Sequence, residues 1–275
     1  MKQVMHKVMF AAVLATGITS CSQNSITGRN QLTLYNEADI QSMAAQQYQQ
    51  FLTENKVVSA TGSKDAEMVR RIGSRLVAAI NQYYSSQGKT AELEGYKWEY
   101  NLVNSQEVNA WCMPGGKIVV YTGLLPITQN EAALAVVMGH EIAHALAKHG
   151  NERMSQASLQ QLGGVALQTA IANKSAAAQN VLLSAYGIGS NVGALLPFSR
   201  KQELEADRFG LIFSSMAGYN PQEAIPFWER MAAAGGAKPL EFLSSHPSDE
   251  TRIANIRSYM PQALKFYNPI SKQPA

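Results

Sequence analysis

The spacing of apolar and polar positions changes twice along the chain. Apolar side chains first recur every three or four positions, which predicts amphipathic helices at 36–52 and 65–84. Aromatic and β-branched residues then dominate, which predicts strands at 96–103 and 116–125, with an edge strand between them that ends in Pro-Gly-Gly. The helical period then returns, over about 130–149, 152–172, 176–186, 199–217, 221–233 and 249–260.

These patterns predict an α+β fold that is mostly helical and has a small antiparallel or mixed sheet. A chain of 275 residues with 46% hydrophobic content can build one sizeable domain or two small ones. The formal net charge is only +3, and a nucleic-acid partner would require a clustered basic face. We therefore expect no nucleic acid among the partners.

The first twenty residues have the features of a bacterial export signal. Two lysines precede an apolar run at 8–19 that is too short to span a bilayer comfortably. The run ends in ITSC, which resembles a lipobox with Cys21 as the lipidated residue, although an ordinary signal peptide is the alternative. A lipid on Cys21 predicts a periplasm-facing anchor in the cell envelope, and Ser22 favours the outer membrane. Cys112 then remains alone and is expected to be a small buried residue rather than a nucleophile.

The sequence thus divides into a signal peptide at 1–20, a tether at 21–35, a folded domain at 36–262 and a tail at 263–275. Within the domain, residues 175–199 carry no charge. Asparagines, serines and glycines interrupt this stretch, so an apolar loop, a lid or plain core fits it better than a transmembrane helix.

The most informative chemistry lies in the apolar helix predicted at 130–149. His140 and His144 are four residues apart, so they share one helix face and can bind a single ion. Zinc in catalytic sites takes three protein ligands and a water, and Glu141 can reach that water as a general base. Burying three polar groups in this helix is costly unless something such as a metal compensates. Because so short a motif also arises by chance, a third ligand has to be found.

A third ligand is available on another helix. A third histidine on the same helix is excluded, since Gly150 occupies the position that the extended zinc motif requires. His149 lies one residue earlier, and we expect it to point to another face as a cap or packing residue. Glu203 and Asp207 share a face of the helix at 199–217, so Glu203 can bind the metal while Asp207 orients a liganding histidine. Glu205 is expected to face elsewhere.

Four separated segments together resemble peptidase family M48, a family of zinc metallopeptidases, and in particular its periplasmic lipoprotein members. The likeness extends over about 26–260 and implies a zincin-like metallopeptidase domain whose edge strand lines the active-site cleft. It implies one zinc ion per chain, bound by His140, His144 and Glu203, with Glu141 as the general base. The segments are NAWCMPGGKIVVYTGLL at 109–125, HEIAH at 140–144, ELEAD at 203–207 and HPSDETRI at 246–253.

The resemblance implies further roles around the metal. An edge strand at 107–113 would pair with an extended polypeptide, and Asn109 and Ala110 would provide backbone contacts near the scissile bond. His246 would lie close to the zinc, where it either fills the open position or stabilises the oxyanion; a loop histidine without a role is the alternative. Arg252 is a further candidate that anchors this loop or acts at the site.

We therefore expect a zinc metalloendopeptidase, with a zinc-activated water as nucleophile, that cleaves misfolded or unassembled envelope proteins. The alternative is a latent protease that works mainly as a chaperone or assembly factor for outer-membrane proteins, with the outer-membrane assembly machinery as its partner. A purely structural lipoprotein would bind no zinc.

Overall fold

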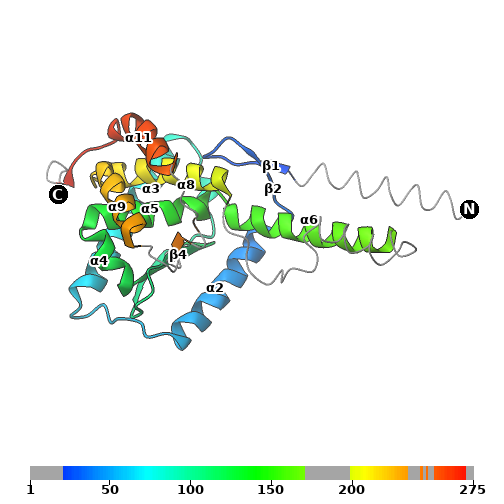
Figure 1. The fold of residues 1–275 in the computed structure, drawn as a ribbon, viewed down its shortest axis with the longest axis horizontal. Helices are drawn as coiled ribbons and strands as arrows, with labels where there is room; N and C mark the ends of the chain where they lie inside the picture. The colour runs from blue at the N-terminus through cyan, green and yellow to red at the C-terminus, as the bar shows by residue number, and fades with distance from the viewer. Residues whose placement is uncertain (1–20, 171–198, 235–241, 244–245, 247–250, 271–275) are drawn as a thin grey trace, which may run out of the picture. The chain divides into compact units, whose positions relative to one another are not determined.

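The computed structural model describes residues 21–170, 199–234, 242–243, 246 and 251–270. The predicted signal peptide, the predicted helix at 176–186 and nearly all of the uncharged stretch lie outside the described residues. The chain forms two compact units (Figure 1). The smaller contains residues 21–24, 28–36 and α6 from Gly150 onward, and the larger contains most of the rest.

The larger unit contains a mixed sheet of three strands in the order β3-β5-β4. The strands β3 (Glu99–Val103) and β5 (Lys117–Tyr121) are parallel, and β4 (Ala110–Met113) pairs antiparallel with β5. Gly115 and Gly116, with φ values of 81° and 83°, form the turn between β4 and β5, a backbone shape that glycine adopts without strain. In this strand order β4 lies at an edge of the sheet, as the sequence predicts.

Most of the predicted helices are present in the larger unit, and their ends differ from the prediction by a few residues. The described helices of this unit are α2 (Glu37–Glu54), α3 (Lys64–Ser86), α4 (Leu125–Thr128), α5 (Glu131–Leu146), α8 (Arg200–Met216), α9 (Ala224–Ala234) and α11 (Thr251–Leu264), with short 3-10 helices at Thr90–Leu93, Thr122–Leu124 and Pro221–Glu223.

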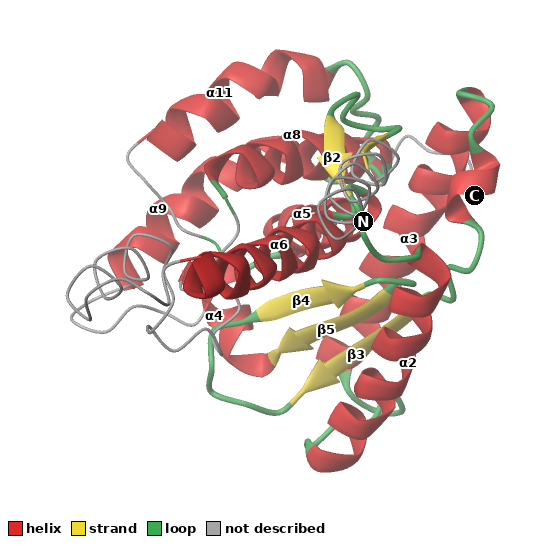
Figure 2. Cartoon of the chain, turned by 90° about the vertical axis from the view of Figure 1, so that its right-hand side faces the viewer, coloured by secondary structure: helices red, strands yellow, loops and turns green. Residues whose placement is uncertain are grey.

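Helices cover both faces of the sheet, because neighbouring side chains of a strand point to opposite faces. Ile118 and Val120 of β5 belong to the main core with α3 and α5, while Val119 and Tyr121 pack with Tyr48 of α2. Figure 2 shows α5, α8 and α11 stacked in succession above the sheet. The sheet and α8 thus enclose α5, the helix that carries the HEIAH segment.

The helices α5 and α8 approach one another closely at two glycines. A Cβ atom on Gly139 would lie 2.9 Å from the carbonyl oxygen of Gly210, and one on Gly210 would lie 2.7 Å from the backbone nitrogen of His140. Both distances are far shorter than a carbon atom tolerates, so the crossing requires two glycines. It brings the backbone of α8 against the start of the HEIAH segment.

The helix after α5 begins earlier than the sequence pattern predicts. Helices were expected at 130–149 and 152–172, but α5 ends at Leu146 and α6 covers His149–Ala170. Lys148 has a φ of 54°, a left-handed conformation that costs a non-glycine residue energy and interrupts the helix. His149 therefore starts a new helix instead of continuing α5.

In the smaller unit, the segment expected to be a tether forms a hairpin. The strands β1 (Cys21–Gln23) and β2 (Asn30–Leu32) pair antiparallel. Arg29 holds Glu152 of α6 through both guanidinium Nη atoms, the second at 2.7 Å, and the backbone N–H of Leu34 donates to Ser155 Oγ at 2.9 Å. These contacts fix residues 28–36 along the first turns of α6.

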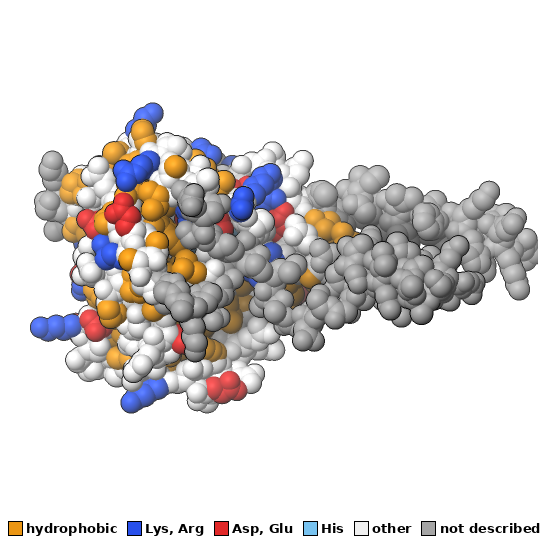
Figure 3. Space-filling view, viewed as in Figure 1, with side chains coloured by type: hydrophobic (Ala, Val, Ile, Leu, Met, Phe, Trp, Pro, Cys, Tyr) orange, Lys and Arg blue, Asp and Glu red, His pale blue; other side chains and the backbone are white. Residues whose placement is uncertain are grey.

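On one face of the molecule, charged and hydrophobic side chains are interspersed. Figure 3 shows lysine, arginine and acidic side chains dispersed over it, with hydrophobic side chains between them. None of the helices in the described ranges is both long enough and apolar enough to cross a membrane.

The glycine crossing predicts that Gly210→Ala destabilises the protein. The added methyl group must push α8 away from α5, and such overpacking costs about 1–3 kcal/mol of unfolding free energy. Chemical denaturation measures this loss. Gly150→Ala is the matched control, because a Cβ there meets no atom within 4 Å and is expected to leave the stability equal or slightly raised. Equal stability of both variants would contradict a tight crossing.

Candidate metal centre and active site

The helix α5 places three polar side chains in the interior. Asn130 caps its N-terminus by accepting a hydrogen bond from the Ala133 N–H, and every residue from Ala133 to Leu146 is buried. His140, Glu141 and His144 are each only 3% exposed. Their burial is favourable only where each polar atom finds a partner, so their partners define the site.

The helix α8 brings a carboxylate to the two histidines. Ser199 and Gln202 form a capping box that fixes where this helix begins, which puts Glu203 in the first turn. A carboxylate there is also favoured by the helix dipole. Glu203 Oε1 lies 3.3 Å from His144 Nε2, and Glu203 Oε2 lies 3.6 Å from His140 Nε2.

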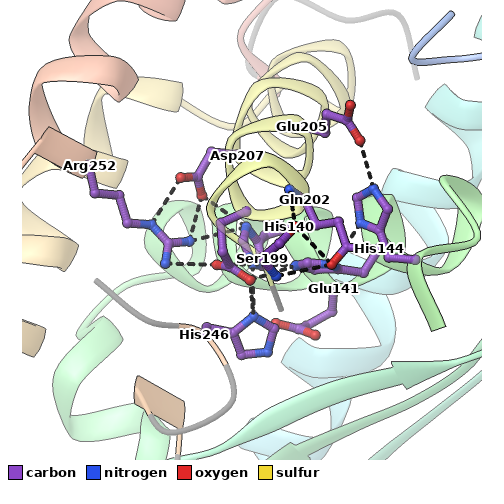
Figure 4. Close-up of polar contacts among 11 residues, drawn as sticks. His140, Glu141, His144, Ser199, Gln202, Glu205, Asp207, His246 and Arg252 are labelled. Carbon is purple, nitrogen blue, oxygen red and sulfur yellow. Dashed lines mark hydrogen bonds and ion pairs between the residues drawn. The ribbon is translucent and has the colours of Figure 1, made fainter. Parts of the chain in front are cut away.

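The ring nitrogens of the two histidines converge on one point. His140 Nε2 and His144 Nε2 are 3.0 Å apart, and Figure 4 shows both rings meeting the side chains of α8. Together with Glu203 and His246 they offer four ligand atoms that all lie within 4.8 Å of one another. The structure therefore brings together the three predicted zinc ligands and the predicted neighbouring histidine.

Asp207 holds His140 in the orientation that such convergence needs. Its Oδ1 lies 2.9 Å from His140 Nδ1, one helical turn after Glu203, as the spacing predicts. The ionised carboxylate can only accept, so Nδ1 carries the proton and Nε2 presents its lone pair to the cluster. Burial raises the pKa of Asp207, but the Arg252 guanidinium and the His140 hydrogen bond outweigh it and lower the pKa overall.

Arg252 of α11 connects both carboxylates. Its Nε and Nη2 donate to Asp207 at 2.9 and 2.8 Å, and its Nη1 lies 2.9 Å from Glu203 Oε2. The guanidinium also stacks on Trp228, 3.6 Å from the ring centroid. Arg252 is only 3% exposed, so it is a buried part of the cluster.

Glu141 and His246 face each other beside the converging nitrogens. His246 Nε2 is 3.5 Å from Glu141 Oε1, and its Nδ1 is 3.0 Å from Glu203 Oε1 and 3.3 Å from His140 Nε2. Burial raises the pKa of Glu141, although His246 and His140 partly offset this. A carboxylate with a raised pKa can both accept and return a proton near neutral pH, as a general base requires.

The donor set fits a zinc ion. The Nε2 atoms of His140 and His144 and a carboxylate oxygen of Glu203 are buried and directed at one point. Three such electron-pair donors would repel one another without a cation between them. Zinc favours these ligands and this number of them, and Asp207 provides the outer hydrogen bond that metal-bound histidines usually make.

His149 and Glu205 also contact the site, which the sequence pattern did not predict. The prediction that His149 points away from His144 is wrong, because the break at Lys148 turns its ring alongside that of His144, with the ring centroids 4.9 Å apart. Glu205 does face away from Glu203, and it lies 2.9 Å from His149 Nε2. The positive φ at Lys148 carries no sequence signal, so periodicity alone predicted one continuous helix.

The edge strand beside the cluster directs backbone groups away from β5 at alternate residues. The carbonyl oxygen of Asn109 accepts from the Tyr121 N–H at 3.0 Å, and Asn109 Oδ1 accepts from the Ala110 N–H at 2.9 Å. Since Asn109 faces β5, the carbonyl groups of Ala110 and Cys112 point to the open edge. Burial raises the pKa of the Cys112 thiol, which keeps it protonated and unsuited to a nucleophilic role.

Comparison with known proteins agrees with this geometry. Residues 63–260 match the model of peptidase family M48. The chain is 39% identical over 183 residues to mitochondrial metalloendopeptidase OMA1 of Saccharomyces cerevisiae, covering 64% of this chain and 50% of that protein. It is 30% identical over 255 residues to the Bos taurus protein of that name, covering 90% of this chain and 47% of that one.

A bacterial relative has a different name. The beta-barrel assembly-enhancing protease of Escherichia coli is 29% identical over 198 residues, which covers 70% of this chain and 38% of that protein. The matches thus span half or less of the length of these relatives. The family match covers most of this chain and includes every residue of the buried cluster, so the chain belongs to peptidase family M48.

Proposed function

We propose that this chain is a zinc-dependent metalloendopeptidase that hydrolyses peptide bonds of polypeptides. The observation that supports this most directly is the convergence of His140 Nε2, His144 Nε2 and Glu203 Oε1 on one buried point, with Glu141 beside it. The family to which the chain belongs, and the names of its relatives as metalloendopeptidases and a protease, agree with this activity.

Each residue has a defined task in this proposal. His140, His144 and Glu203 hold the zinc ion, which when bound acidifies a water molecule and polarises the substrate carbonyl. Glu141 accepts the proton of the attacking water and delivers it to the departing amine. Asp207 and Arg252 keep His140 and Glu203 in place, since both are bound to these side chains in the buried cluster.

The substrate binds in this proposal as an extended strand along β4. The carbonyl groups of Ala110 and Cys112 point away from β5, the direction in which an added strand would donate to them. Asn109 contributes its side chain, which holds the Ala110 N–H, rather than its own carbonyl group. We further propose misfolded or unassembled envelope proteins as substrates, because the export signal predicted at 1–20 would bring the chain to the cell envelope.

Removing the general base tests the mechanism. Glu141→Gln in the purified full chain should retain one zinc per chain but lose about 10²- to 10⁴-fold in casein cleavage, because the amide cannot accept the proton. Zinc is measured by elemental analysis and cleavage by fluorescence. The control is Glu131→Gln on the same helix, a partly exposed position paired with Arg71 outside the buried cluster, which should keep full activity.

Two results would contradict this mechanism. Casein cleavage by Glu141→Gln at the rate of the wild type would exclude Glu141 as the base. Wild-type chain that binds no zinc would exclude the metal and favour a structural lipoprotein.

A second candidate function is a latent protease that mainly acts as a chaperone or assembly factor. Its support is the position of His246, whose ring atoms lie 3.0–3.5 Å from Glu203, His140 and Glu141, where a water or substrate would have to enter. Phe242 connects this histidine to the edge strand: its N–H donates to the Val108 carbonyl at 3.1 Å and its ring stacks on His246. Both the metal position and part of the strand edge are thereby covered.

His246→Ala distinguishes the two functions. If the chain is latent, removing the imidazole opens the fourth metal position, and casein cleavage should rise above that of the wild type. If His246 instead stabilises the oxyanion, cleavage should fall by about 10²-fold or more. The double variant Glu141→Gln with His246→Ala is the control, because any gain that comes from the site must disappear in it.

We also propose that the chain is attached to the outer membrane by a lipid on Cys21, facing the periplasm. The ITSC sequence supports this proposal. Cys21→Ser in a bacterial host should lose the incorporation of radioactive palmitate and move to the soluble fraction, whereas Cys112→Ser should keep both the label and its membrane. Label retained by Cys21→Ser would contradict the anchor, and density fractionation identifies the membrane.

A further inference from the structure

His149 and Glu205 form a buried chain of contacts that ends on a proposed metal ligand. His149 Nδ1 lies 2.9 Å from His144 Nδ1, and His149 Nε2 lies 2.9 Å from Glu205 Oε2. His149 is fully buried, and the Glu205 side chain is only 15% exposed. Neither His149 nor Glu205 is among the proposed zinc ligands or is the general base, and both lie with His144 in the larger unit.

The positions of the protons follow from the outer end of this chain. An ionised Glu205 carboxylate only accepts, so His149 donates to it from Nε2. A neutral imidazole with its proton on Nε2 has a lone pair on Nδ1, and that lone pair accepts from His144. His144 therefore carries its proton on Nδ1, and its Nε2 is free to face the cluster.

The backbone at Lys148 is strained where it positions His149. In an unbroken helix a residue five positions after His144 would point well away from it. Lys148 instead adopts a φ of 54°, and a new helix begins at His149. This break turns the imidazole ring of His149 toward the ring of His144. A non-glycine residue in this conformation costs about 1–2 kcal/mol, so the surrounding structure must favour it.

We infer that His149 is a positioning residue that, with Glu205, fixes the tautomer and ring orientation of His144 for metal binding. This inference rests on the proposed zinc site. The two liganding histidines are then oriented separately: His140 by Asp207, and His144 by Glu205 through the intervening imidazole. Figure 4 shows Asp207 and Glu205 on opposite sides of α8.

The helix α8 thus supplies the ligand carboxylate of Glu203 and the two carboxylates, Asp207 and Glu205, that orient the histidine ligands. Residues 203, 205 and 207 occupy alternate positions, so the outer two share a face and the middle one points away. The middle carboxylate can serve the site only because His149 extends its reach to the far side of His144. The acidic triplet ELEAD and the histidine five residues after His144 form one functional set.

The tautomer of His144 can be measured without metal or activity. In the purified full chain with ¹⁵N-labelled histidine, stripped of metal, nitrogen chemical shifts should report a proton on Nδ1 of His144. His149→Phe keeps a ring in place but removes the acceptor, so the proton should redistribute toward Nε2. His149→Asn places an oxygen near the former Nδ1 position and should largely restore the wild-type tautomer.

Zinc affinity gives the second measurement. Competition with a chelator should show that His149→Phe raises the zinc dissociation constant by about 10- to 100-fold, the usual effect of losing an outer hydrogen bond to a metal ligand. His149→Asn should show a smaller rise. Asn151→Ala is the matched control: it removes a hydrogen bond to the Tyr35 carbonyl at the same helix start, and should leave the dissociation constant and the tautomer unchanged.

Glu205→Leu covers the case in which His149→Phe fails to fold. This substitution lies closer to the surface and removes only the outer acceptor, so the proton of His144 should again shift toward Nε2 and the zinc affinity should fall. A wild-type tautomer and wild-type zinc affinity in His149→Phe or in Glu205→Leu would overturn the inference. Absence of zinc from the wild type would instead overturn the proposed function and leave the tautomer measurement interpretable.

Discussion

The site depends on the close crossing of α5 and α8. Gly139 and Gly210 remove the two Cβ atoms that would separate these helices, so the acidic first turns of α8 reach the histidines of α5. Histidines at 140 and 144 would otherwise be polar groups in an apolar helix. Their burial becomes favourable because carboxylates from α8 and the guanidinium of Arg252 arrive on the opposite side.

The buried charges of Glu203, Asp207 and Arg252 are paired with one another. Two buried carboxylates, Glu203 and Asp207, face one buried arginine, and each also meets an imidazole. Burial raises the pKa of Glu203, but the contacts to His144 and His246 outweigh this and keep the group ionised. The helix packing and the electrostatics therefore support each other, because moving either helix would leave a buried charge without its partner.

Sequence pattern predicted the fold class and most of the elements, because helical and strand periods reflect which face is buried. It also placed Glu203 and Asp207 on one helix face, since that relation is local, and both lie in the cluster. The turn at Lys148 could not be predicted, because its left-handed backbone depends on tertiary contacts to His149 rather than on the residue itself. The position of His246 was implied by family resemblance and not by spacing, since it comes from a distant loop.

The hydrogen bond between Phe242 and Val108 protects part of the sheet edge from pairing with other chains. An uncovered strand edge is a template on which any unfolded chain, including another copy of this protein, can extend a sheet. The Phe242 N–H occupies one carbonyl group of the segment that leads into β4, so among the described residues the unpaired edge is confined to β4 itself, beside the buried histidines. A shorter unpaired edge offers less length on which a second copy of the chain could add a strand, so this bond would reduce self-association through the sheet.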